Sequence, residues 1–157
     1  MFRLQSSHRE TNNRELYRVA LREAIDSDHN VLIKDRLVSI SSNKTNYSIF
    51  KFKKDIQFIN KGLNQKLIHK RKYKRSPNRI VFWCFFEKSK GKLLTHTHMI
   101  LRVPVNLKNY VDTIIEKIIR RYLPSGFSLV ISHQPEAIEY STKHYSNIFN
   151  DEMFDIF

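Results

Sequence analysis

The sequence contains little of what builds flexible or disulfide-bonded proteins. Its 157 residues include one cysteine, three glycines and four prolines. Cys84 therefore has no partner for a disulfide within the chain, and its position in an apolar run predicts a core residue in a reducing compartment. Because so few glycines leave little room for linkers, we expect a single domain over residues 1–157.

Other signals are missing as well. No stretch approaches the roughly 18 uncharged apolar residues that a membrane span requires, and residues 1–6 lack the apolar centre of a secretory signal. We therefore expect no membrane partner and a cytoplasmic protein, or one in the host's nucleic-acid compartment if the chain is viral. A Walker-type Gly-x-x-x-x-Gly-Lys motif is also missing, so any helicase must be a separate protein.

Positive charge is the strongest feature that is present. The chain has 28 Lys and Arg against 15 Asp and Glu, a net charge of +13. Such an excess attracts polyanions, of which nucleic acid is the most common. An aromatic-containing basic loop is a candidate for holding a phosphate backbone and stacking on a base, although a solvated surface turn is the alternative. Its residues are Lys70, Arg71, Lys72, Tyr73, Lys74, Arg75 and Arg79.

The hydrophobic pattern predicts an α+β domain. We expect helices over residues 12–26, 55–68, 107–122 and 135–147, and strands over residues 31–39, 47–52, 80–87, 93–103 and 127–132. Residues 80–87 are too apolar for an edge strand and suit a central position. The fold class that follows is a five-stranded, mainly antiparallel sheet flanked by helices. The acidic, aromatic residues 151–157 could dock a partner or pack on their own domain.

Two histidines in one expected strand form the first chemical motif. His96 and His98 are two residues apart, so both imidazoles leave the same face of the sheet and can bind a divalent metal. If the hairpin turns at residues 90–91, Glu87 lies opposite Leu94 and is a diagonal neighbour of His96. A His-His-Glu set suits Mg²⁺ or Mn²⁺. The alternatives are a chance His-x-His pattern and an exposed carboxylate at a turn.

A tyrosine and a lysine in the last expected helix form the second motif. Tyr140 and Lys143 lie one turn apart and are neighbours on the helix surface. A nearby ammonium group favours the phenolate and offsets charge that builds on a phosphate during nucleophilic attack. A packed aromatic ring beside a solvent-facing lysine is the alternative interpretation.

Together these motifs resemble the HUH endonucleases. The similarity covers about residues 80–147 and rests on Leu-Thr-His-Thr-His-Met-Ile-Leu, residues 94–101, followed by Ile-Glu-Tyr-Ser-Thr-Lys, residues 138–143. The histidines precede the tyrosine, as in the replication initiators of small plasmids and viruses. Several of these carry an acidic ligand eight or nine positions before the first histidine, and Glu87 stands nine positions before His96.

The resemblance implies a mechanism for nicking single-stranded DNA at an origin or hairpin to start rolling-circle replication. His96, His98 and Glu87 would hold the metal, with His144 as an alternative third ligand and His133 and Glu136 as weaker candidates. Tyr140 would attack the phosphodiester to give a 5′-phosphotyrosine, with Lys143 steadying the charge. A separate helicase or host replication proteins would be the expected partners.

The chain departs from the family pattern at two points. Thr97 stands between the histidines where the family has a hydrophobic residue, and no clear Phe/Thr/Asn strand motif precedes them; residues 47–52 are its best location. A single-tyrosine transposase with the same chemistry is an alternative, although such enzymes usually carry Gln or His at the position of Lys143. A non-catalytic module that binds nucleic acid is the other alternative.

Overall fold

The computed structural model describes residues 30–33, 35–68, 73–88, 94–142 and 154–157. An antiparallel sheet forms its centre, with strands in the order β5-β2-β4-β3-β6 and β1 also paired with β4. This arrangement confirms the expected α+β class and the central position of residues 80–87. The strands are β1 (Asn30–Leu32), β2 (Arg36–Ser42), β3 (Val81–Lys88), β4 (Thr95–Pro104), β5 (Phe127–His133) and β6 (Phe154–Ile156).

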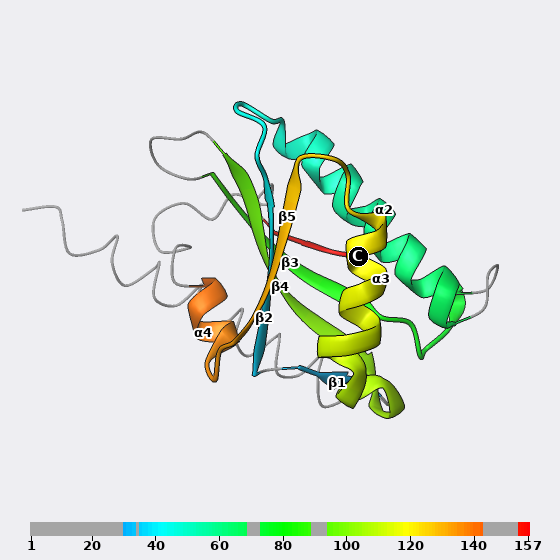
Figure 1. Cartoon of the computed structure of the whole chain (residues 1–157). Coiled ribbons are helices and arrows are strands. Elements are labelled where there is room, and N and C mark those ends of the chain that lie inside the picture. Colours follow the sequence, from blue (N-terminus) through cyan, green and yellow to red (C-terminus); the bar gives the residue numbers. More distant parts are fainter. Residues whose placement is uncertain (1–29, 34, 69–72, 89–93, 143–153) are drawn as a thin grey trace, which may run out of the picture.

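Helices cover both faces of the sheet. The long helix α2 and the shorter α3 lie on one side, and α4 lies on the other (Figure 1). A 3₁₀ turn, η2, and a π-helical turn, η3, lead into α3, and a further 3₁₀ turn, η1, precedes β3. The bounds are α2 (Ile49–Leu67), η1 (Tyr73–Arg75), η2 (Val105–Tyr110), η3 (Val111–Ile115), α3 (Glu116–Tyr122) and α4 (Ala137–Thr142).

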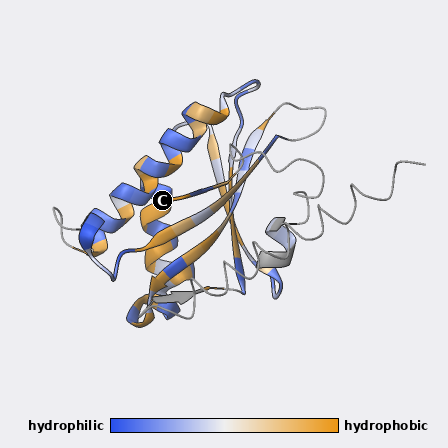
Figure 2. Cartoon of the chain, turned by 180° about the vertical axis from the view of Figure 1, so that it is seen from behind, coloured by the Kyte–Doolittle hydropathy of each residue, from blue (hydrophilic) through white to orange (hydrophobic). Residues whose placement is uncertain are grey.

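The central strands are apolar on both faces, which creates two cores. On the side of α2 and α3, Phe82, Cys84 and Phe86 of β3 belong to the larger cluster. On the side of α4, Trp83 and Phe85 belong to a smaller cluster. Figure 2 shows the hydrophobic colouring of the central strands and the mixed colouring along the helices. Burial raises the pKa of the Cys84 thiol well above its ordinary value, as expected for a core cysteine.

The expected strand over residues 47–52 is wrong, because α2 begins at Ile49. Phe52, Ile56 and Leu63 are fully buried on the helix side that faces the sheet, whereas Phe50 is 69% exposed. The segment Ile-Phe-Lys-Phe alternates locally like a strand, but Phe52 also continues the four-residue spacing of the helix. Packing against the sheet selects the helix. Residues 47–52 therefore cannot be the strand that carries the first motif of the HUH endonucleases.

Other elements differ in their bounds. The expected strand over residues 31–39 is divided in two: β1 ends at Leu32, β2 begins at Arg36, and both pair with the same edge of β4. The helix expected over residues 107–122 is divided into η2, η3 and α3. The expected helix over residues 12–26 lies outside the described residues. The helix expected over residues 135–147 begins two residues later than expected: residues 135–136 form a turn, α4 starts at Ala137, and residues 143–147 lie outside the described residues.

The end of the chain supplies the fifth strand of the sheet path. β6 pairs with β3, and Phe82 and Phe157 exchange backbone hydrogen bonds of 2.7 and 3.0 Å. Lys53 on α2 forms an ion pair with Asp155, with Nζ 2.6 Å from Oδ2. Residues 154–157 therefore pack on their own domain, with Ile156 50% exposed.

Two buried asparagines attach α2 to the start of β3. The Ile80 backbone N–H donates to Asn64 Oδ1 at 2.7 Å. Asn64 Nδ2 donates back to the Ile80 carbonyl at 2.8 Å, and Asn60 Nδ2 donates to the same carbonyl at 3.1 Å. Buried backbone groups need such partners, so this pair fixes where the helix meets the sheet.

We expect Asn64→Ala to destabilise the fold by about 2–4 kcal/mol, because it leaves the buried Ile80 N–H without its acceptor and weakens the bonding of the Ile80 carbonyl. Chemical denaturation followed by circular dichroism measures the change. Gln65→Ala, at the neighbouring partly exposed position, is the matched control and should cost less than about 1 kcal/mol. Equal stability of Asn64→Ala and the wild type would contradict the assigned role.

Candidate metal centre

The pairing of β3 with β4 places Glu87 directly opposite His96. The expectation that Glu87 faces Leu94 is therefore wrong by two residues, because the connection between the strands is longer than a turn centred on residues 90–91 requires. A shift of two residues preserves the face of the sheet on which each side chain lies. Glu87, His96 and His98 consequently share one face, as expected.

The imidazoles of His96 and His98 approach the same carboxylate oxygen of Glu87. His96 Nε2 lies 3.0 Å from Glu87 Oε2, and His98 Nε2 lies 3.9 Å from the same atom. One potential ligand atom from each residue falls within 4.8 Å of the other two, and all three residues are partly buried. The imidazole rings of His96 and His98 meet edge to face at a centroid distance of 5.2 Å.

This donor set fits a divalent cation. Neighbouring ligands on an octahedral ion with bonds of about 2.1 Å lie roughly 3 Å apart, so small side-chain movements bring the three donors to binding distance. Two imidazoles and one carboxylate can bind a divalent cation, for which Mn²⁺ is a suitable probe, and leave further coordination positions for a substrate. A proton shared by His96 and Glu87 would occupy the same lone pairs, so metal and proton compete here.

Ser39 is a site residue that the sequence reasoning missed. Its Oγ lies 2.9 Å from His98 Nδ1, and β2 places Ser39 directly opposite His98 on β4. The alternation in the sequence could have indicated this residue. Ser39 and Ser41 alternate with the buried Val38 and Ile40, which predicts two hydroxyl groups on the side of the sheet away from the main core.

Tyr140 lies beside the histidines. Its ring meets that of His98 edge to face, at a centroid distance of 5.5 Å and an interplanar angle of 85°. Ala137, one turn earlier in α4, is fully buried in the smaller core, and Tyr140 packs against the same cluster. The short helix thus brings Tyr140 beside the candidate metal ligands His96 and His98. Lys143 and His144 lie outside the described residues.

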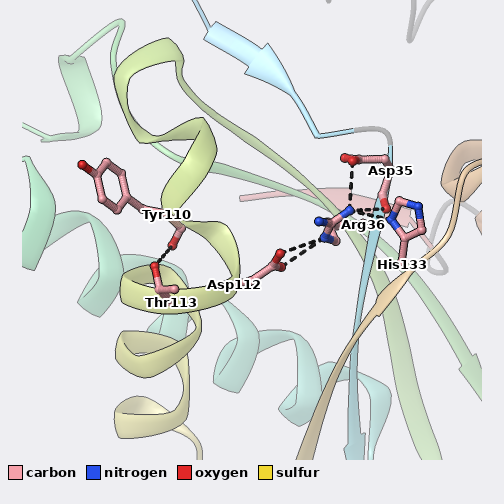
Figure 3. A network of polar contacts seen from close by, with 6 residues as sticks. All are labelled: Asp35, Arg36, Tyr110, Asp112, Thr113 and His133. Atoms are coloured by element: carbon pink, nitrogen blue, oxygen red, sulfur yellow. Dashed lines mark hydrogen bonds and ion pairs between the residues drawn. The ribbon is translucent and has the colours of Figure 1, made fainter.

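His133 belongs to a different network (Figure 3). It is exposed at the end of β5, where its Nδ1 accepts a hydrogen bond of 2.6 Å from Arg36. Arg36 also pairs with Asp112 at 2.9 Å and Asp35 at 2.9 Å, and the hydrogen bond to Asp112 raises the pKa of Arg36. Neither His133 nor the exposed Glu136 belongs to the candidate metal-binding group of Glu87, His96 and His98 among the described residues.

The basic loop lies at the other end of β3 from Glu87. It precedes Val81, which is six residues and therefore about 20 Å along the strand from Glu87. Lys74, Arg75 and Arg79 are exposed and Tyr73 is partly buried, while Lys70, Arg71 and Lys72 lie outside the described residues. The described residues of this loop therefore do not lie at the cluster of Glu87, His96 and His98.

Comparisons with protein-family models, with curated proteins and with solved structures find no match to this chain. Among the helices of the described residues, none is both long enough and apolar enough to cross a bilayer. Functional inference therefore depends on the geometry and chemistry of the cluster itself.

We expect Mn²⁺ to stabilise the protein by about 2.7 kcal/mol at a concentration 100 times its Kd, because only the folded state assembles the cluster. Thermal unfolding with and without Mn²⁺ measures this effect, which should disappear in the double variant His96→Ala/His98→Ala. His133→Ala, which removes a histidine outside the cluster, is the control and should keep the response. Persistent stabilisation of the double variant would rule out this site.

Proposed function

We propose that the protein is a metal-dependent endonuclease that nicks and rejoins single-stranded DNA through a tyrosine nucleophile, of the type that initiates rolling-circle replication. The observation that carries the proposal is the position of Tyr140, whose ring lies 5.5 Å from that of His98 beside the cluster of Glu87, His96 and His98. A nucleophile and a set of ligands for a phosphate-binding metal are thus neighbours on one face of the sheet.

The reaction is a transesterification. The Tyr140 phenolic oxygen forms a bond to phosphorus as the bond from phosphorus to the 3′-oxygen breaks; the phenol loses a proton and the leaving oxygen gains one. The product is a 5′-phosphotyrosine and a free 3′-hydroxyl, with no oxidation or reduction. Since the phosphotyrosine is again a diester, the reverse reaction rejoins the strand.

Each described residue has a distinct task in this scheme. Glu87, His96 and His98 would hold the cation, which when bound would polarise the scissile phosphate. Phe85 belongs to the buried cluster against which Tyr140 and Phe154 both pack, and the ring centroids of Phe85 and Phe154 are 5.1 Å apart. This apolar support restricts the tyrosine ring and lowers the local dielectric, so charge interactions at the phosphate are stronger than in water.

Lysines near the same end of the sheet support a nucleic-acid substrate. Lys88 is exposed and directly follows Glu87. Lys44 and Lys51 lie 5.5 and 5.3 Å from the ring of Tyr47, and the Tyr47 carbonyl accepts a hydrogen bond of 2.7 Å from Thr95, the neighbour of His96. Such cations attract the phosphate backbone without reading its sequence. In the proposed mechanism Lys143, three residues after Tyr140 in the sequence, adds a positive charge.

We expect Tyr140→Phe to abolish the covalent protein–DNA adduct while leaving DNA affinity within about threefold, because the change removes one oxygen atom and keeps the ring. The assay incubates the protein with a labelled pool of single-stranded oligonucleotides and Mn²⁺, then separates linked DNA on a denaturing gel. EDTA should also prevent the adduct. Tyr110→Phe, a change at an exposed tyrosine outside the cluster, is the matched control.

The same gel tests the alternatives. Adduct formation by Tyr140→Phe at the wild-type level would exclude Tyr140 as the nucleophile. DNA binding without any adduct, across metals and sequences, would favour the non-catalytic binding module. Joining of paired transposon ends rather than nicking at one origin would favour the transposase.

The basic loop gives a separate prediction. The double variant Lys74→Ala/Arg75→Ala should bind single-stranded DNA more weakly, irrespective of its sequence, and the slope of log K against log salt should fall by about 1.4 for two lost phosphate contacts. Fluorescence anisotropy at several salt concentrations measures both quantities. Cleavage at saturating DNA should persist, because Lys74 and Arg75 precede the end of β3 that is about 20 Å from Glu87. Lys117→Ala, a change at an exposed lysine of α3, is the control; an unchanged salt slope in the double variant would refute the contact.

A further inference from the structure

We propose that Ser39 is a positioning residue that fixes the tautomer and orientation of His98 for metal binding. This inference deepens the proposed function and rests on its metal centre. The observation behind it is the 2.9 Å contact between Ser39 Oγ and His98 Nδ1, on the opposite side of the imidazole from the nitrogen that approaches Glu87.

Only one proton arrangement of this contact permits His98 to bind a cation through Nε2. A neutral imidazole carries its proton on one nitrogen and a lone pair on the other. If Nδ1–H donates to Ser39 Oγ, the lone pair is on Nε2 and points towards the cluster. If instead the Ser39 hydroxyl donates to Nδ1, then Nε2 carries the proton and cannot ligate. Metal binding therefore requires Ser39 to act as the acceptor.

Backbone pairing on both sides of β2 holds Ser39 in place opposite His98. Ser39 lies opposite His98 on β4 and opposite Val130 on β5, so ladders on both sides fix the strand that carries the hydroxyl. Both Ser39 and His98 are partly buried, which limits competition from water for the same hydrogen bond. A short serine side chain on a paired strand has few alternative positions, so it holds the imidazole in one orientation.

His96 and Ser41 provide an internal comparison. Ser41 lies opposite His96 in the same strand pair, two residues from Ser39 and on the same face. Whereas Ser39 contacts His98, the described hydrogen bonds of His96 lead to Glu87, and Ser41 makes no side-chain hydrogen bond within the described residues. Ser39→Ala and Ser41→Ala thus remove the same atom from equivalent strand positions, but only the first removes a contact to a ligand.

The first test is Mn²⁺ binding by calorimetry to the full chain. We expect Ser39→Ala to lower the affinity about 10- to 100-fold, as loss of a partner behind a metal ligand usually does. Ser41→Ala should stay within about threefold of the wild type, and Ser39→Thr, which keeps a hydroxyl, should restore most of the affinity. Wild-type affinity in Ser39→Ala, or equal losses in both alanine variants, would overturn the role of Ser39.

The second test is spectroscopic and needs no metal. Long-range ¹H–¹⁵N spectra of the histidine rings distinguish the two tautomers. We expect His98 to carry its proton on Nδ1 in the metal-free wild type and to lose this preference in Ser39→Ala; a proton on Nε2 in the wild type would overturn the inference. The metal centre and the role of Ser39 can be refuted separately. Failure of the wild type to bind Mn²⁺ would refute the metal centre, whereas normal Mn²⁺ binding in Ser39→Ala would refute only the role of Ser39.

Discussion

The antiparallel pairing of β3 with β4 is the constraint on which the rest of the structure depends. Its register sets Glu87 opposite His96, and the period of two sends alternate residues of both strands to opposite faces. A slip of one residue would move His96 and His98 into the core beneath α2 and bring Thr97 to the surface under α4. The fully buried side chains of Phe82, Phe86 and Met99 on the α2 side oppose such a slip by burying apolar area.

The two faces of this pair have different physical roles. On the α2 side, apolar packing and the bonds between Asn64 and Ile80 provide stability. On the α4 side, polar residues occupy one end of the strands, and the apolar cluster around Trp83 and Phe85 occupies the rest. Tyr140 lies where the polar and apolar parts meet. The first face can therefore keep the sheet rigid while the second presents chemical groups.

Sequence reasoning found the parts of this arrangement that depend on local periodicity. It predicted a shared face for His96 and His98 and the central position of β3, because alternation and apolar content determine both. It misassigned residues 47–52, where a helical and an extended pattern overlap and only packing of Phe52 decides. The contact of Ser39 with His98 and the pairing of β6 with β3 involve residues far apart in the chain, for which the sequence offered no spacing rule. The hairpin register depends on the length of the connection between β3 and β4, which the apolar pattern left undetermined.

The cluster itself argues for binding rather than stability. A partly buried ion pair contributes little net stability, because desolvation offsets most of the attraction, and a single histidine would be enough to pair with Glu87. Here a second imidazole approaches the same carboxylate oxygen at 3.9 Å, and a hydroxyl contacts that imidazole from behind. Three donors around one point, with a supporting hydrogen bond, match what a cation requires. In the proposed mechanism, the position of Tyr140 beside them would give such a cation a reaction to assist.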